Sequence, residues 1–355
     1  MEKKPSLKAS IHRSIQERRE EIDLEHFKLT TAQELVPGQL VPLMIQSAMN
    51  GVNLSSWAAN NRDYLRGELD KHGAILFRNF HVDAAAKFEE FARSAAIDGE
   101  LFDEYGDLPR DDPGAKVYHS TPYPADKSIL FHNESSHMHR WPMKIFFYCV
   151  KAADGGGATP ILDCRETYRQ LDPVIRKRME EKKLMYIRNF IDGLDVSWQQ
   201  FFGTSSKKAV EDYCRRSGID FEWKGENRLT TRQICQAVAR HPRTGDKLFF
   251  NQIQLHHISC LDPDVKESIL SMFSEDDLPR SVCYGDGTPI EDSVVTEISA
   301  MYDRLAIRFQ WQAGDIILLD NMMTAHARDP FEGTRKILVA MAEIVSQKEI
   351  LALGV

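Results

Sequence analysis

Short apolar runs, separated by Gly, Pro and Asp residues, recur along the chain from residue 74 onward. Nine of these segments have the length and the content of β-branched and aromatic residues that are typical of strands. They are "AILFRNF", "SILFH", "KIFFYCV", "TPILD", "LMYIRNF", "KLFFNQ", "LAIRFQW", "DIILLD" and "KILVAMAE". The spacing of apolar residues predicts helices at 53–73, 83–99, 164–182, 207–216, 262–275 and 291–304. Because strands and helices do not alternate regularly, a parallel doubly wound sheet is disfavoured. We expect a mainly β fold with helical decoration, of the β-sandwich or jelly-roll type.

The first 35 residues differ from the rest of the chain. They are rich in Lys, Arg and Glu, as in "IHRSIQERREEIDLEHFK", and carry few apolar residues. From residue 36 to 350, Pro and Gly are spread evenly, and neither a repeat nor a low-complexity linker divides the chain. The sequence therefore predicts an N-terminal extension at 1–35 and a single domain with helical insertions at 36–350.

Composition and charge narrow the classes of function. The 45 basic and 53 acidic residues are mixed along the chain and give a formal charge of −8, so no large basic surface is available for nucleic acid. The apolar runs are too short to cross a membrane, and the N-terminus has no signal-peptide pattern, which predicts a cytoplasmic protein. The six cysteines show no CxxC spacing and are expected to be reduced and buried.

The stretch "FHNESSH" carries the first candidate chemistry, because it follows the strand-like run at 128–131 directly. His132 and Glu134 are two residues apart, so in an extended strand both side chains lie on one face. Two ligands seldom hold iron or zinc firmly, and the best third donor is His326, expected in a short loop between two strands. Two histidines and one carboxylate form the facial arrangement that leaves one side of Fe(II) open.

Simpler interpretations exist for several of these polar residues. With His137 and His139, the same stretch could form a self-contained zinc cluster, although structural zinc usually recruits cysteines. His137 is otherwise expected to face a substrate or the solvent. Asn251 follows a buried run in "KLFFNQ", where a hydrogen-bonded core amide is as plausible as a pocket residue.

Two longer segments resemble a known family. These are "FHNESSHMHRWPMKIFFYCVKAADGGGATPILDCRETY" and "WQAGDIILLDNMMTAHARDPFEGTRKILVAM". They resemble the clavaminate synthase and taurine dioxygenase superfamily of Fe(II)/2-oxoglutarate-dependent oxygenases, and within it the syringomycin-type aspartyl hydroxylases. The likeness covers most of the chain, and it implies a double-stranded β-helix, or jelly roll.

The resemblance also implies roles for individual residues. His132, Glu134 and His326 would bind iron, while Thr159 and Arg335 would hold the far carboxylate of 2-oxoglutarate. Arginine suits this task because its planar donor set matches a carboxylate. Arg328, expected in a loop, is a second candidate for 2-oxoglutarate or for a substrate carboxylate, and the resemblance makes Asn251 a pocket candidate.

The implied reaction consumes O2 and 2-oxoglutarate to hydroxylate an unactivated C–H bond. The substrate would be an amino acid or a derivative, free or tethered to a peptidyl carrier protein, in natural-product biosynthesis. Halogenating relatives have a small residue at the position of Glu134, so hydroxylation is favoured over chlorination. Desaturation and cyclisation use the same ligands and stay open.

Two other classes of function also stay open. A cupin-like metal-binding isomerase or binding protein would not need 2-oxoglutarate, Thr159 or Arg335. An inactive interaction protein would bind the cofactors without turning over a substrate.

Overall fold

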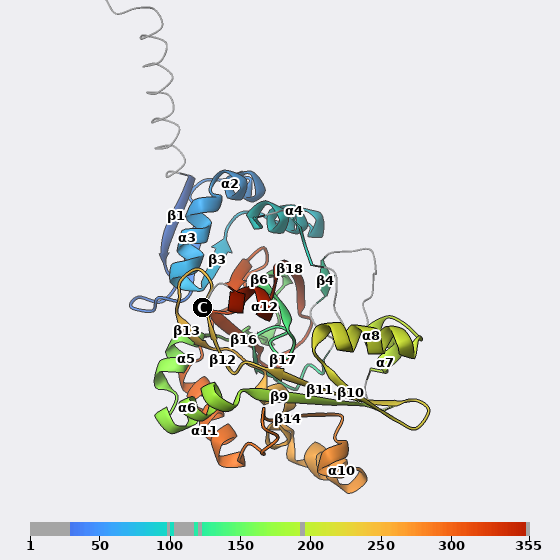
Figure 1. Cartoon of the computed structure of the whole chain (residues 1–355). Coiled ribbons are helices and arrows are strands. Elements are labelled where there is room, and N and C mark those ends of the chain that lie inside the picture. Colours follow the sequence, from blue (N-terminus) through green and yellow to red (C-terminus); the bar gives the residue numbers. More distant parts are fainter. Residues whose placement is uncertain (1–28, 98–99, 103–116, 120–122, 192–195, 353–355) are drawn as a thin grey trace, which may run out of the picture.

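The computed structural model describes residues 29–97, 100–102, 117–119, 123–191 and 196–352, and its largest element is a seven-stranded sheet (Figure 1). Its strands lie in the order β1-β2-β3-β15-β6-β18-β4, and all neighbouring pairs are antiparallel except β2 and β3. The bounds are β1 Thr30–Glu34, β2 Leu43–Ser47, β3 Ala74–Arg78, β4 Tyr118–His119, β6 Arg140–Lys151, β15 Ile316–Asp320 and β18 Lys336–Ser346.

A three-stranded antiparallel sheet, in the order β5-β16-β8, packs against this large sheet. Its strands are β5 Ile129–His132, β8 Ile161–Asp163 and β16 Thr324–Arg328. A separate short pair is formed by β7 Gly155–Gly156, which precedes β8 in the chain, and β17 Phe331–Glu332, which follows β16. Ile161 of β8 shares a buried cluster with Ile145 of β6 and Ile317 of β15, which places the two sheets face to face. From β5 to β18, the chain crosses repeatedly between them.

Helices cover the outer face of the large sheet (Figure 1). These are α2 Leu54–Asn60, α3 Arg62–His72 and α4 Ala85–Ala95. Asn53 caps α2 by accepting a hydrogen bond from the backbone N–H of Ser56, and Gly73 ends α3 in the left-handed conformation. Phe88 and Phe91 of α4 pack on Phe146 and Tyr148 of β6. The alternate residues of β6, such as Ile145 and Phe147, face the three-stranded sheet.

A further four-stranded antiparallel sheet, in the order β10-β11-β9-β14, is built mainly from the middle of the chain. The remaining strands are β9 Leu184–Phe190, β10 Asp220–Lys224, β11 Arg228–Cys235, β12 Val238–Arg240, β13 Lys247–Phe249 and β14 Arg280–Tyr284. The remaining helices are α5 Cys164–Gln170, α6 Pro173–Lys182, α7 Trp198–Phe202, α8 Lys207–Ser217, α9 Ile253–His256, α10 Pro263–Met272, α11 Asp292–Leu305 and α12 Gln347–Ala352, with 3-10 turns at Ile258–Cys260 and Glu275–Asp277.

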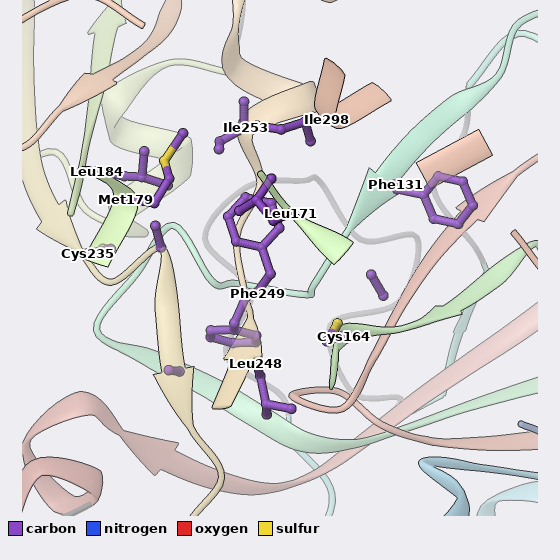
Figure 2. Packing of buried hydrophobic residues seen from close by; sticks show 14 of the residues in the cluster. Phe131, Cys164, Leu171, Met179, Leu184, Cys235, Leu248, Phe249, Ile253 and Ile298 are labelled. Atoms are coloured by element: carbon purple, nitrogen blue, oxygen red, sulfur yellow. The ribbon is translucent and has the colours of Figure 1, made fainter. Parts of the chain in front are cut away.

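The largest hydrophobic cluster joins this sheet to the three-stranded sheet. Figure 2 shows several of its members, among them Phe131, Cys164 and Phe249. All six cysteines are free, as expected, and four of them are buried. None of the described helices is long and apolar enough to cross a membrane.

The observed fold departs from the expected one in several places. Helices occupy about as many described residues as strands, so the fold is mixed and not mainly β. The predicted helix at 164–182 is divided, because Asp172 caps a new helix that opens with Pro173. The run "LAIRFQW" forms no strand; only Ile307 makes an isolated bridge, to Ile161. The polar strands β10 and β11 were not expected.

The N-terminal boundary also lies differently. The strand β1 begins at Thr30 and pairs with β2 in the large sheet, inside the segment expected to be an extension. Residues 1–28 lie outside the described residues, so the extension stays a prediction there.

Candidate metal and oxo-acid site

His132 and His326 face one another across a pair of strands. They are directly opposed partners of β5 and β16, and their ring centroids are 4.3 Å apart. Opposed residues of an antiparallel pair have neighbouring side chains, so the pairing itself brings the two imidazoles together. His326 therefore lies within a strand, not in the loop that the sequence suggested.

Glu134 completes a group of three possible ligands. The Oε2 atom of Glu134 lies 3.9 Å from Nε2 of His132. One ligand atom from each of His132, Glu134 and His326 lies within 4.8 Å of the other two. The side chains of His132 and Glu134 are 11% and 12% exposed, so the group opens to solvent only slightly. The side chains of His132 and Glu134 converge as predicted, although β5 ends at His132 and Glu134 lies beyond it, and the predicted third donor joins them.

Both histidines can offer a ring nitrogen to a metal. Nδ1 of His132 lies 2.8 Å from the carbonyl oxygen of Leu130, to which it donates in the tautomer that leaves the Nε2 lone pair for a metal. Burial holds the pKa of His326 well below its usual range, and the neighbouring His132 lowers this pKa further. A neutral imidazole is the form that binds a metal, and two histidines with one carboxylate suit Fe(II) with open coordination positions.

Thr159 and Arg335 meet beside this group. The guanidinium of Arg335 donates from Nη2 to Thr159 Oγ1 at 3.0 Å and from Nε to the carbonyl oxygen of Gly157 at 2.9 Å. Thr159 lies two residues before Ile161, which is the strand partner of His326 on the side away from β5. The predicted pair is thus brought together next to the metal-binding candidates.

Trp311 belongs to the same arrangement, although the sequence did not single it out. Its indole Nε1 donates to Thr159 Oγ1 at 3.1 Å. This bond and the one from Arg335 fix the position of the hydroxyl. The alternating apolar residues of "LAIRFQW" indicated burial of Trp311, but nothing in that pattern indicated its partner.

Arg335 is a partly buried cation without a carboxylate partner among the described residues. Burial, together with the positive charge of Arg328, lowers its pKa to about 10. An uncompensated buried charge is unfavourable, and an incoming carboxylate would relieve this cost. The site is therefore suited to an anionic ligand that reaches from the metal position toward Arg335.

Gly157 makes room for this arginine. It has a φ of +70°, and a Cβ atom added there would lie 2.9 Å from the Cβ of Ala153 and 3.1 Å from the Cδ of Arg335. Any other residue would be strained by its backbone conformation and would crowd the guanidinium stem. The Gly-Gly-Gly segment thus serves the approach of Arg335 to Thr159.

Arg328, the second candidate for a carboxylate, has hydrogen-bond partners within the fold. It lies on β16, not in a loop, and its Nη atoms donate to the carbonyl oxygens of Tyr123, Pro124 and Lys127. The side chain is buried, and its guanidinium also lies over the rings of Tyr123 and Phe331. Three of the five N–H groups of its guanidinium are engaged by the segment that precedes β5, and the buried Nε makes no hydrogen bond among the described residues.

The remaining candidates lie outside the group of three. The imidazole of His137 packs against the phenol ring of Tyr186 and the imidazole of His256, at centroid distances of 6.0 and 5.2 Å. Asn251 donates to the hydroxyl of Tyr302 at 3.3 Å and accepts from the backbone N–H of Ile253 at 3.0 Å. Asn251 is therefore the hydrogen-bonded core amide, the simpler of its two interpretations.

The zinc alternative is not supported by the geometry. The nitrogens of His139 lie within hydrogen-bonding distance of the carbonyl oxygens of Ser217 and Ile234, at 2.9 and 2.8 Å. Neither His137 nor His139 belongs to a ligand group among the described residues.

A second group of possible metal ligands consists of Asp70, His241 and Asp320. The negative charges of its two carboxylates are already paired with an arginine. Nη2 of Arg243 lies 2.7 Å from Asp70 and 3.1 Å from Asp320, so a guanidinium takes the position of a cation. Burial alone would raise the pKa of Asp320, but His241 and Arg243 hold it below its usual value. This group is an ion-pair network.

The chain matches known proteins over most of its length. The model of the family described as taurine catabolism dioxygenase TauD, TfdA family, matches residues 34–341. The dapdiamide synthesis protein DdaC of Enterobacter agglomerans is 38% identical over 277 residues, which cover 78% of this chain and 84% of that protein. A clavaminate synthase-like protein of Arabidopsis thaliana is 27% identical over 292 residues, which cover 79% and 85%.

A solved structure shows the same fold. PvcB of Pseudomonas aeruginosa superposes with a TM-score of 0.53 at 13% identity, over 89% of this chain and 91% of that chain. The extent of the family match, together with the identity to DdaC, establishes the family. The chain belongs to the TauD, TfdA family and is a dioxygenase that depends on Fe(II), 2-oxoglutarate and O2.

Proposed function

We propose that His132, Glu134 and His326 bind the iron of this dioxygenase, and that Thr159 and Arg335 bind the far carboxylate of 2-oxoglutarate. The convergence of one ligand atom from each of the three residues within 4.8 Å carries the proposal. The alternation of strands between two facing sheets supports a double-stranded β-helix as the scaffold. The cation of Arg335, with no acidic partner among the described residues, favours a cosubstrate with a second carboxylate.

The residues of the site have separate tasks in this proposal. Iron, when bound, supplies the activation of O2 that is coupled to the conversion of 2-oxoglutarate to succinate and CO2. Arg335 and Thr159 orient the cosubstrate by binding its far end. Phe147 packs edge-on against His326, with ring centroids 5.0 Å apart, and closes one side of the site with an apolar wall. Glu134 occupies the position that a halide would need.

We propose hydroxylation of a C–H bond of an amino acid or its derivative in natural-product biosynthesis. The name of the 38% identical relative, which refers to dapdiamide synthesis, supports this pathway class. The absence of basic surface runs from the sequence argues against nucleic acid as a substrate. Desaturation and cyclisation are alternative outcomes at the same site, and a peptidyl carrier protein and a cytoplasmic location belong to the proposal.

The cupin-like alternative has less support. A metal-binding isomerase has no use for a guanidinium that is held beside the metal ligands by Thr159 and Gly157. The same contacts are what a dicarboxylate cosubstrate requires.

Anaerobic absorption spectroscopy tests the ligand assignment. Fe(II) and 2-oxoglutarate should give a weak visible charge-transfer band with the wild-type protein. The band should disappear in His326→Ala and persist in His257→Ala, a matched control because His257 is also buried and bonds Ile290 and Ser259 instead. A wild-type protein without the band, or a band that survives His326→Ala, would contradict the assignment.

Product analysis tests the reaction. Amino acids, free and loaded on a carrier protein, should be screened for succinate release. A product that gains one oxygen atom indicates hydroxylation, whereas a loss of two hydrogens indicates desaturation or cyclisation. Binding of both cofactors without succinate release from any substrate would favour the inactive interaction protein.

A further inference from the structure

Asn321 holds the backbone of Glu134 from both sides. Glu134 lies beyond the end of β5, and the chain turns at Ser135, which has a φ of +55°. The Oδ1 atom of Asn321 accepts from the backbone N–H of Glu134 at 2.7 Å, and its Nδ2 donates to the backbone carbonyl of Glu134 at 2.9 Å. The side-chain amide thus binds Glu134 as a neighbouring strand would.

Asn133 holds Asn321 in turn. The side-chain Nδ2 of Asn133 donates to the backbone carbonyl of Asn321 at 2.7 Å. The backbone carbonyl of Asn133 accepts from Gln252 Nε2 at 3.0 Å and from Ser136 Oγ at 2.8 Å. Nδ2 of Asn321 also donates to Pro142 O at 2.8 Å. We call Asn133 and Asn321 the amide clamp. Each of its side chains binds the backbone of the segment that carries the other.

The clamp joins the two halves of the metal site. Asn133 lies between His132 and Glu134, and Asn321 opens the loop that leads to His326. Asn133 and Asn321 are 1% and 0% exposed, so their bonds form away from water, where a lost partner is costly. The two bonds from Asn321 to the backbone of Glu134 restrict the position of its Cα atom, from which the side chain extends.

We propose that the amide clamp positions the carboxylate of Glu134 as a metal ligand, with Asn321 as the positioning residue, and so sets the affinity of the site for the metal. The inference rests on the proposed function, because it takes Glu134 to be a ligand. Groups that orient metal ligands typically change metal affinity roughly 10- to 100-fold when they are removed. A purely structural amide would change stability alone.

Titration with Co(II), followed by its visible absorption, separates the two roles in the full-length protein. Asn321→Ala should bind Co(II) roughly 10- to 100-fold more weakly than the wild type, with an altered Co(II) spectrum. Asn189→Ala is the matched control. Asn189 is buried, and its side chain bonds Thr230, Asp276 and Leu278 among the described residues. It should lose comparable stability while its Co(II) affinity stays within about twofold of the wild type.

The outcomes distinguish the clamp from the ligand assignment. Asn321→Ala with wild-type Co(II) affinity and spectrum would overturn the clamp. If this variant does not fold, Asn321→Ser is tested in its place, and failure of both to fold while Asn189→Ala folds would also overturn it, because Asn321 would then serve folding. A wild-type protein whose Co(II) binding is unaffected by His326→Ala would instead refute the proposed ligands.

Discussion

Replacement of Arg335 by Met tests whether this arginine lacks a strong partner in the ligand-free protein and binds an anionic ligand. Lowering its pKa from 12.5 to about 10 corresponds to about 3 kcal/mol of cost for the charged side chain in the folded protein. Because the folded-state pKa of this base is the lower one, the cost is present at all pH values below about 10. The variant removes this cost.

The variant also removes two hydrogen bonds, to Gly157 O and Thr159 Oγ1. Bonds from a charged donor contribute about 1.5 to 3 kcal/mol each, so their loss is largely offset by removal of this cost. We expect the free energy of unfolding of the ligand-free protein to fall by no more than about 3 kcal/mol. The stabilisation by 2-oxoglutarate, about 3 kcal/mol at about 100 times its dissociation constant, should disappear.

Arg78→Met is the matched control for a paired arginine. Nη2 of Arg78 lies 2.6 Å from Oδ2 of Asp315, whose side chain is 1% exposed. Loss of one partner leaves a buried unpaired carboxylate, so this variant should lose about 3 to 5 kcal/mol but keep the stabilisation by 2-oxoglutarate. Urea unfolding with Fe(II), with and without 2-oxoglutarate under anaerobic conditions, measures both quantities.

Two results would refute the reasoning about Arg335. A loss of more than about 4 kcal/mol in ligand-free Arg335→Met would mean that the arginine already has a strong partner. Retention of the stabilisation by 2-oxoglutarate would mean that the cosubstrate binds elsewhere.

Two further substitutions test neighbouring features. Gly157→Ala should lower the free energy of unfolding by about 1 to 2 kcal/mol through its positive φ, and it should raise the KM for 2-oxoglutarate by crowding Arg335. Gly203→Ala, at a φ of +62° with open space around it, should show the backbone strain alone. Equal KM values for the two variants in steady-state kinetics would contradict the crowding. Arg328→Met removes three bonds to the segment at 123–127 and should speed its hydrogen exchange, while unchanged exchange would show that other contacts hold this segment.

The part of the site formed by His132 and Glu134 could be predicted from the sequence. The apolar run before His132 indicated a strand, whose alternation would place His132 and Glu134 on one face. The strand β5 ends at His132, yet the two side chains converge. His326 was predicted as a partner but misplaced in a loop, because "TAHAR" is a weak strand pattern. Its strand is stabilised by β5 and β8 on either side, which no short window of sequence contains.

Side-chain partners across the fold were the least predictable features. The amide of Asn321 binds the backbone of Glu134 in a distant segment, which no local sequence pattern indicates. Trp311 was visible as an apolar position, and its bond to Thr159 depends on how the two sheets pack. Arg328 gave no sign of its direction, because the loop assigned to it was part of a strand.

The opposition of His132 and His326 across two strands has a consequence for folding. A metal held by both residues is a crosslink between segments that lie far apart in sequence, and it forms only when β5 and β16 are paired. In the unfolded chain these imidazoles are seldom close, so the free energy of metal binding adds to the stability of the folded state. Under the proposed ligand assignment, loss of iron therefore removes a crosslink between β5 and β16 as well as a reactive centre.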